Sequence, residues 1–252
     1  MNRQVEANLS MVVSKALGGL NMNALKYLLP LWIAPVTGVT FRLVFGAAAF
    51  WLIDIFCKPE NSTIRQKWQL FILGALGIYG YMFFYLLGIS KTTDLASNAP
   101  LGNLMCLASS LVYAVYLVFS NRLLKGVGDM TMLKYTFLGA AVMAVVVNTI
   151  YGFDAPILKM SLFSTPMLVL LFVLVFPTTI SYLLLPLGLK YLKTTLVAIY
   201  GYLILIVATV TSFVLGQDRF SWTQLAAIVL ICASVYLVEV AESNKQITSK
   251  LK

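Results

Sequence analysis

This chain is built from apolar blocks about 20 residues long, and their length leaves few folds open to it. A helix of that length crosses the hydrocarbon core of a bilayer, which is about 30 Å thick. The chain of 252 residues is 60% hydrophobic and 11% charged, whereas soluble domains are about 45–50% apolar and about 25% charged. The sequence therefore predicts an all-α integral membrane protein with several spans.

Eight candidate transmembrane helices follow from the places where polar and turn-forming residues interrupt the apolar blocks. Two such breaks are "KPENSTIRQKW" after the second block and "GQDRFSW" after the seventh. The expected spans are 8–30, 36–56, 68–90, 97–123, 131–151, 166–189, 194–215 and 222–241. The expected fold is thus a polytopic membrane helix bundle of about eight transmembrane helices.

The basic residues between the blocks predict how the chain is oriented. If the N-terminus is cytoplasmic, twelve lysines and arginines lie on the cytoplasmic side, and only Lys91, Lys159 and Arg219 lie on the other. Cytoplasmic loops of membrane proteins carry the excess of basic residues. We therefore expect a multi-pass protein of the cell membrane with both termini in the cytoplasm. The net charge of +9 reflects these loops and does not indicate a nucleic-acid partner.

Residue types that build most metal and catalytic sites are scarce. The chain has no histidine and three cysteines, Cys57, Cys106 and Cys232, which lack metal-ligand spacing. It has no paired carboxylates, P-loop or Gly-x-Ser-x-Gly motif. We expect neither an enzyme nor an ATP-driven pump, and no metal or cofactor. Because no carboxylate lies in the middle of a predicted span, facilitated passage or exchange is favoured over proton coupling.

Short stretches from the first half of the chain recur later. "FRLVFGAAAF" (41–50) resembles "YTFLGAAVMA" (135–144), and "YLLGISKTTDLASN" (85–98) resembles "LPLGLKYLKTTLVA" (185–198). Spans one to three therefore match spans four to six. The two series start on opposite sides of the membrane, so the repeats are inverted. Inverted repeats are typical of secondary transporters whose solute site lies near the bilayer midplane.

The two repeats differ in length. After "KTTLVA" the second continues for two more spans, whereas after "KTTDLASN" the first stops and the next begins at "PLGNLMCLASS". We expect a truncated repeat of three transmembrane helices over residues 1–98. A repeat of five, with a cytoplasmic tail, follows over 99–252. The loss of two spans leaves the orientation of everything downstream unchanged.

The chain resembles the drug/metabolite transporter superfamily, in particular its EamA-type members. "LGGLNMNALK" (17–26) resembles the family's Trp-Gly-x-Asn start, and "FRL" (41–43) its Phe-Arg-Leu. Residues 73–99 resemble its third span, 102–124 the start of its second half and 188–238 its closing pair. The resemblance implies ten spans in two inverted five-helix halves. It also implies transport of small organic solutes across the cytoplasmic membrane.

The chain departs from this pattern in three places. It lacks most of the fourth and all of the fifth helix of the usual ten. Ile204-Leu205 stands where the ninth span usually has Glu-Pro or Gln-Pro, and Gln217-Asp218 replaces the glutamate that commonly follows. An alternative therefore stays open: an incomplete, non-transporting membrane protein or partner subunit. A homodimer could supply the missing wall, or membrane lipid could fill it.

Charged and amide side chains within the spans are candidates for solute contact, because hydrocarbon offers them no partner. Lys15 and Lys26 lie near span ends, where a lysine can reach the interface. Arg42 lies deeper and either faces a cavity or reaches an interface. Asn21 and Asn23 either contact a solute or make interhelical hydrogen bonds.

The sixth span and the interior tyrosines add further candidates. Pro177 and Pro186 break the sixth span and free carbonyls near Thr178. The break serves as a hinge or solute contact, or nearby hydroxyls satisfy the freed carbonyls. Six tyrosines lie within spans and either line a cavity or pack with one hydrogen bond: Tyr81, Tyr113, Tyr116, Tyr182, Tyr200 and Tyr202.

These features together predict a secondary transporter of a small polar metabolite, amino-acid-like or another organic solute. It would work by alternating access between its inverted halves. The excess of cations over anions within the spans points to a carboxylate-bearing solute, although the charge of the solute stays open. The predicted substrate-binding residues are Asn21, Asn23, Arg42, Tyr81, Tyr113, Thr178, Tyr182 and Tyr200.

Overall fold

The computed structural model describes residues 3–29, 31–92, 98–124, 126–192 and 194–217, with isolated positions 222, 229, 230 and 233. Throughout these residues every regular element is a helix. The chain forms two compact units, one of Met1–Asn23 with Leu187–Lys252 and one of Ala24–Pro186. We call them the terminal unit and the central unit and describe each by itself.

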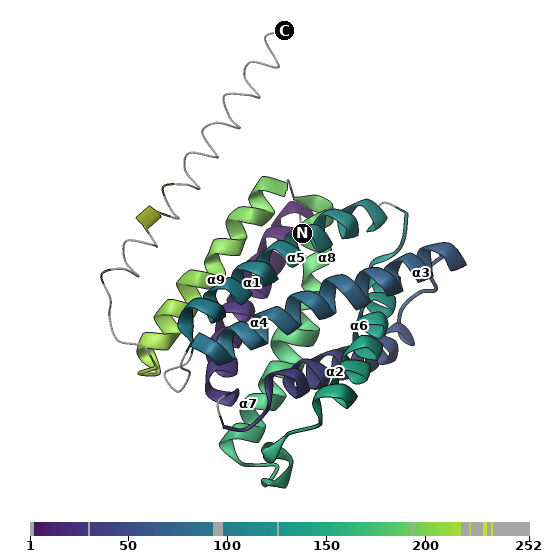
Figure 1. The fold of residues 1–252 in the computed structure, drawn as a ribbon. Helices are drawn as coiled ribbons and strands as arrows, with labels where there is room; N and C mark the ends of the chain where they lie inside the picture. Colours follow the sequence, from purple (N-terminus) through teal and green to yellow (C-terminus); the bar gives the residue numbers. More distant parts are fainter. Residues whose placement is uncertain are drawn as a thin grey trace. The chain divides into compact units, whose positions relative to one another are not determined.

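The helices follow one another without intervening strands in the described residues (Figure 1). Two of the long helices contain a π-helical segment, labelled η1 and η3, and one loop contains a 3₁₀ turn, η2. The elements are α1 (Arg3–Leu28), α2 (Pro35–Asp54), α3 (Ile64–Leu73), η1 (Gly74–Ile78), α4 (Tyr79–Thr92), α5 (Ala99–Leu124), α6 (Asp129–Tyr151), η2 (Pro156–Lys159), α7 (Thr165–Val173), η3 (Leu174–Ile180), α8 (Ser181–Tyr191) and α9 (Thr194–Val214).

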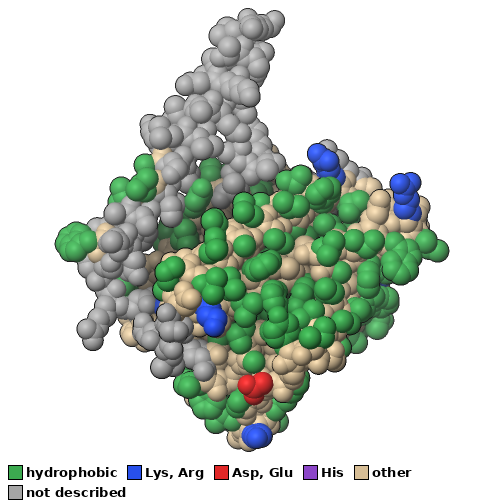
Figure 2. Space-filling model, in the orientation of Figure 1, with side chains coloured by type: hydrophobic (Ala, Val, Ile, Leu, Met, Phe, Trp, Pro, Cys, Tyr) green, Lys and Arg blue, Asp and Glu red, His purple; other side chains and the backbone are tan. Residues whose placement is uncertain are grey.

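Five helices of the described chain are long and apolar enough to cross a membrane: Pro35–Asp54, Ile64–Thr92, Ala99–Ser120, Asp129–Tyr151 and Thr165–Tyr191. They coincide with the predicted second to sixth spans. Together with the helical composition they confirm a polytopic membrane helix bundle. Figure 2 agrees with it, because the visible face carries many hydrophobic side chains and few charged ones.

The first, seventh and eighth predicted spans are not among the five helices of the described chain that are long and apolar enough to cross a membrane. α1 stands in place of the first, begins at Arg3 rather than residue 8, and is not among the five apolar helices. α9 stands in place of the seventh, and its Ile199–Val214 part is a shorter apolar helix. The predicted eighth span, 222–241, lies almost wholly outside the described residues. The total of eight spans and the repeat boundary at residue 98 therefore stay predictions.

In the central unit, α2 and α6 pack against each other as an antiparallel pair. Thr37 near the start of α2 bonds Asn148 near the end of α6, while Asp54 at the end of α2 pairs with Lys134 near the start of α6. Between these ends Phe50 of α2 meets the edge of a phenylalanine of α6, with ring centroids 4.7 Å apart. α4 and α5 form a second close pair, which Figure 1 shows side by side.

The third and sixth predicted spans share an irregularity at a similar number of residues from their start. In the third span η1 follows an α-helical stretch of 10 residues, and in the sixth η3 follows one of 9 residues. η1 contacts α6, and η3 contacts α2. Each π-helical segment therefore packs on the second helix of the other predicted repeat. Such segments are rare in helices and frequent at functional sites.

Candidate solute-binding site

Arg42 is a deeply buried cation in the central unit. It lies on α2, and its side chain is 2% exposed. Its Nε donates a hydrogen bond to Thr178 Oγ1 of η3 at 3.0 Å. Its Nη1 is buried without any hydrogen-bond partner, and no carboxylate of the described residues pairs with it. A buried charge is normally paired because its desolvation is costly. This guanidinium therefore has an unmet capacity to donate hydrogen bonds and to neutralise an anion.

Thr178, the hydrogen-bond partner of Arg42, lies where Pro177 breaks the sixth span. Pro177 has no N–H, so the Val173 carbonyl four residues earlier lacks its helical donor. Thr178 Oγ1 donates to Val173 O at 2.8 Å, and Thr179 Oγ1 donates to Leu174 O at 3.1 Å. Hydroxyls thus satisfy carbonyls within the π-helical segment, as one of the two interpretations of this motif predicts. Because the Thr178 hydroxyl is neutral, it orients Arg42 without cancelling its charge.

Tyr182 on α8 joins the arginine to a group of aromatic side chains. Tyr182 is 7% exposed, and its ring meets that of Phe137 on α6 edge-on, with centroids 4.9 Å apart. It lies close enough to Arg42, Tyr81 and Tyr113 to interact with each of them electrostatically. The rings of Tyr81 on α4 and Tyr113 on α5 have centroids 4.7 Å apart.

The structure therefore brings five predicted site residues together from five elements of the central unit. We call this group the Arg42 cluster: Arg42, Tyr81, Tyr113, Thr178 and Tyr182. Arg42 is its one charged member, and the tyrosine hydroxyls can both donate and accept hydrogen bonds. That these residues contact a solute stays a prediction.

The other three predicted residues belong to the terminal unit. Asn23 Nδ2 donates to Ala208 O at 2.9 Å and also to the Thr211 hydroxyl. Tyr200 OH donates to Asn8 Oδ1 at 3.0 Å. These bonds join α1 to α9, so both side chains make the interhelical contacts that were their alternative role. Asn21 is also buried, and its Oδ1 has no hydrogen-bond partner.

Three residues beside the Arg42 cluster were not among the predicted site residues. The Tyr116 ring stacks against Tyr113 with centroids 6.1 Å apart. Its hydroxyl lies close to Ser120 and Thr136, which are fully buried. Small hydroxyl residues are common in membrane helices, and nothing local distinguishes these two. Tyr116 lies three residues after Tyr113 on the same helix, so their proximity follows from helical spacing, but the sequence offered no signal that Tyr116 packs against protein rather than lipid.

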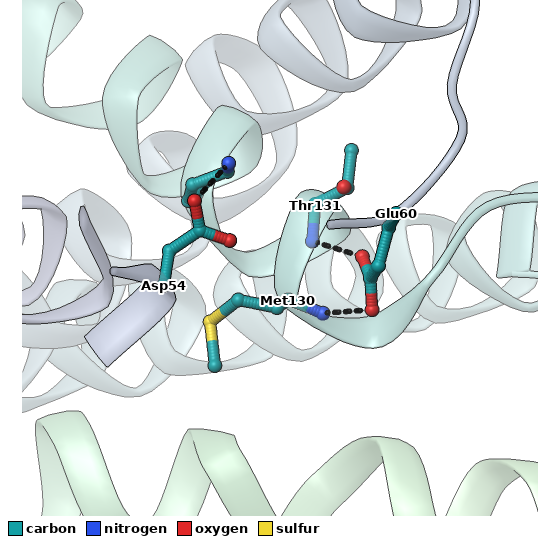
Figure 3. Close-up of polar contacts among 5 residues, drawn as sticks. Asp54, Glu60, Met130 and Thr131 are labelled. Atoms are coloured by element: carbon teal, nitrogen blue, oxygen red, sulfur yellow. Dashed lines mark hydrogen bonds and ion pairs between the residues drawn. The ribbon is translucent and has the colours of Figure 1, made fainter. Parts of the chain in front are cut away.

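Polar contacts fasten the α2 and α6 pair at the end where α6 begins. Lys134 Nζ and Asp54 Oδ2 form an ion pair at 2.5 Å. Glu60, in the loop after α2, accepts hydrogen bonds from the backbone N–H groups of Met130 at 3.4 Å and Thr131 at 2.8 Å. Figure 3 shows its carboxylate facing these two groups. A carboxylate at a helix N-terminus satisfies free N–H groups and complements the helix dipole.

The opposite end of the pair is fastened by Thr37. Thr37 Oγ1 donates to Asn148 Oδ1 at 3.1 Å and accepts from Asp154 N at 3.2 Å. The loops add two backbone bonds, from Ala34 N to Asp154 O and from Ile157 N to Trp32 O, both 3.1 Å long. Arg42 lies on α2 between Thr37 and Asp54. The Arg42 cluster is thus flanked on both sides by contacts that close α2 against α6.

Comparison with known proteins decides the family. The model of the EamA-like transporter family matches residues 100–240, which is more than half of this chain. The chain belongs to the EamA-like transporter family. The resemblance recognised in the sequence is thereby confirmed, although the loss of most of the fourth and all of the fifth helix stays a prediction.

A solved crystal structure of a protein shows the same fold as this EamA-like chain. Its TM-score is 0.62 at 14% sequence identity, and the match covers 93% of this chain and 96% of the other. At that identity the likeness concerns the fold alone. No curated protein matches the sequence.

Membership of the EamA-like family gives this chain a transporter-type function and a multi-pass place in a membrane. It also agrees with the expectation that the protein is not an enzyme, since the family consists of transporters. The membrane concerned and the side on which the termini lie stay predictions.

One groove of this EamA-like chain is chemically unlike the Arg42 cluster. It lies between the α3–η1 stretch and α5, has a volume of about 510 Å³, and is almost wholly apolar. Ile72, Leu76, Val115, Tyr116 and Phe119 are among the residues that line it. An apolar groove gives no hydrogen bonds to orient a polar solute. The Arg42 cluster is therefore the stronger candidate for the solute site.

Proposed function

We propose that this chain is a secondary transporter that moves a small polar organic solute by alternating access, with the Arg42 cluster as its solute site. The observation that carries the proposal is the Arg42 guanidinium, 2% exposed and with an unpartnered Nη1. An unmet buried polar group costs about 1–3 kcal/mol. An arginine at the centre of a membrane helix costs about 2.5–3.5 kcal/mol on insertion scales. Side chains so unfavourable for stability are retained where function uses them.

The surroundings of Arg42 suit a solute that is organic as well as polar. Tyr81, Tyr113 and Tyr182 lie close to one another, and each has an aromatic face and a hydroxyl group. The faces pack against carbon atoms, and the hydroxyls fix orientation through hydrogen bonds. Thr178 holds Arg42 Nε, which leaves Nη1 for the solute. The members come from α2, α4, α5, η3 and α8, so movement of these helices would change the site.

Alternating access is supported by the relation between the predicted repeats. α2 and α6 run antiparallel, as the second helices of two inverted repeats should. η1 and η3 begin a similar number of residues after the start of their spans, and each packs on the second helix of the other predicted repeat. In this proposal the contacts of Thr37 and those of Asp54 and Glu60 act as the two gates. One set opens while the other holds, and the π-helical segments absorb the change in helix direction.

Reconstitution of the purified chain in liposomes tests the proposal. Uptake of a panel of radiolabelled small polar solutes is compared with empty liposomes and with Arg42→Gln liposomes. We expect at least one solute to enter wild-type vesicles at a saturable rate that Arg42→Gln lowers at least tenfold. If correctly inserted, folded wild-type protein moves nothing in the panel, the alternative of an incomplete, non-transporting protein or partner subunit is favoured. Native mass spectrometry of the same sample then reports whether a homodimer forms.

A further inference from the structure

We infer that the transported solute carries a single carboxylate, and that this carboxylate binds Arg42 Nη1 as the counter-ion that none of the described residues supplies. The inference rests on the proposed function and names its substrate class. Its starting point is the charge of the Arg42 cluster. Arg42 is its one ionised member, and among the described residues no carboxylate pairs with it. A neutral solute would leave this buried charge uncompensated.

The chemistry of Arg42 favours a carboxylate over a neutral acceptor. Nη1 carries two N–H donors, and neither has a hydrogen-bond partner. A carboxylate adds the attraction of opposite charges and can accept two parallel N–H bonds from a guanidinium, which a neutral acceptor cannot match. The folded protein has already removed Arg42 from water, since its side chain is 2% exposed. Binding an anion therefore adds a strong contact without a further desolvation penalty on the protein side.

The balance of charge limits the solute to one negative group. The tyrosines and Thr178 of the Arg42 cluster supply no positive charge, so Arg42 is its one cation. One carboxylate cancels the charge of Arg42. A dicarboxylate or a phosphate dianion would leave a second negative charge buried with no cation among the cluster's residues, which is strongly unfavourable. The tyrosine hydroxyls remain as donors to the second carboxylate oxygen or to a hydroxyl on the solute.

Thermal-shift measurements on the wild-type protein test the inference without any substitution. The probes are acid and amide pairs of equal shape, lactate with lactamide and nicotinate with nicotinamide, alongside malonate and chloride. A ligand at 100 times its Kd should raise the Tm by about 5–10 °C. We expect at least one monocarboxylate to do so, while its amide, malonate and chloride shift the Tm by less than about a fifth of that amount.

A matched pair of variants locates the effect. Arg42→Gln removes the proposed counter-ion, and Lys91→Gln removes a positive charge from an exposed residue at the end of α4 in the same unit. The shift caused by the acid should vanish in Arg42→Gln and persist in Lys91→Gln. If Arg42→Gln does not fold, the comparison of acid with amide on the wild-type protein decides alone.

Three results would overturn the inference. Equal shifts by acid and amide would mean that the solute need not be charged. Equal shifts by lactate, malonate and chloride would mean that any anion suffices. A shift that Arg42→Gln retains would place the anion elsewhere. Liposomes that accumulate a neutral solute through Arg42 would leave the proposed function standing while this inference fails. Liposomes that accumulate nothing would remove the proposed function itself.

Discussion

Replacing Gly139 with alanine should strongly destabilise the central unit. Gly139 is in the middle of α6, and a Cβ built there would lie 2.0 Å from the carbonyl oxygen of Phe71 on α3. The same closeness is seen one turn away, where a Cβ on Gly74 would lie 1.8 Å from the Thr136 carbonyl oxygen. Both obstacles are backbone atoms, so no side-chain rotation relieves the clash. α3 and α6 would have to separate by about 1 Å or more to restore ordinary contact.

The magnitude follows from the packing that this separation disrupts. Overpacking a core usually costs about 1–3 kcal/mol and sometimes more. Because neither backbone can yield locally, we expect about 3 kcal/mol or more for Gly139→Ala. For a chain of this size that corresponds to a fall in Tm of about 6–12 °C. Phe137, two residues before Gly139, packs on Tyr182, so the shift should also lower the affinity of the Arg42 cluster for its solute.

Gly80→Ala is the matched control. Gly80 is on α4 of the same unit, and a Cβ there would lie 3.5 Å from Val112 Cγ1, an ordinary van der Waals distance. Alanine favours a helix over glycine by about 1 kcal/mol, so this variant should melt at or slightly above the wild-type temperature. The measurement is the fraction of monodisperse protein after heating in detergent, read by size-exclusion chromatography. If the two variants melt within about 2 °C of each other, the close approach of α3 to α6 is refuted.

Three further predictions concern the contacts that fasten α2 to α6. Asp54→Asn should lower the free energy of unfolding by about 1 kcal/mol by breaking the ion pair with Lys134. Additive effects in a double-mutant cycle with Lys134→Met would show that the pair contributes nothing. Thr37→Val should cost about 1–2 kcal/mol because Asn148 loses its partner, whereas Thr37→Ser should retain most of the stability. Equal Tm values for these two Thr37 variants would contradict that reasoning. Glu60→Gln should speed hydrogen exchange in the first turn of α6 severalfold by weakening its cap, and unchanged exchange would show that the charge is irrelevant.

Helix positions were readable from the amino-acid order because they depend on local properties. A run of about 20 apolar residues suffices to specify a span, since a helix in lipid satisfies its own backbone hydrogen bonds. The predicted spans 36–56 and 131–151 accordingly match α2 and α6 to within two residues at each end. α1 was harder to delimit, because its polar first turns continue the helix back to Arg3. The sequence predicted a break at Pro177, where η3 lies, whereas η1 contains no proline and was not predicted.

Candidate site residues could be shortlisted in the same way, because polar groups inside spans are few. The sequence does not show which of these candidates contact one another, because that depends on how each helix is rotated and on which neighbouring helix it faces. Arg42 and Thr178 are 136 residues apart and become partners only when η3 packs on α2. Asn23 was an equally good candidate by sequence, yet its amide bonds α9. Local composition sets the number and length of the helices, whereas contacts distant along the chain select the side chains that form a site. Those contacts arise from close packing between whole helices, which no short stretch of sequence encodes.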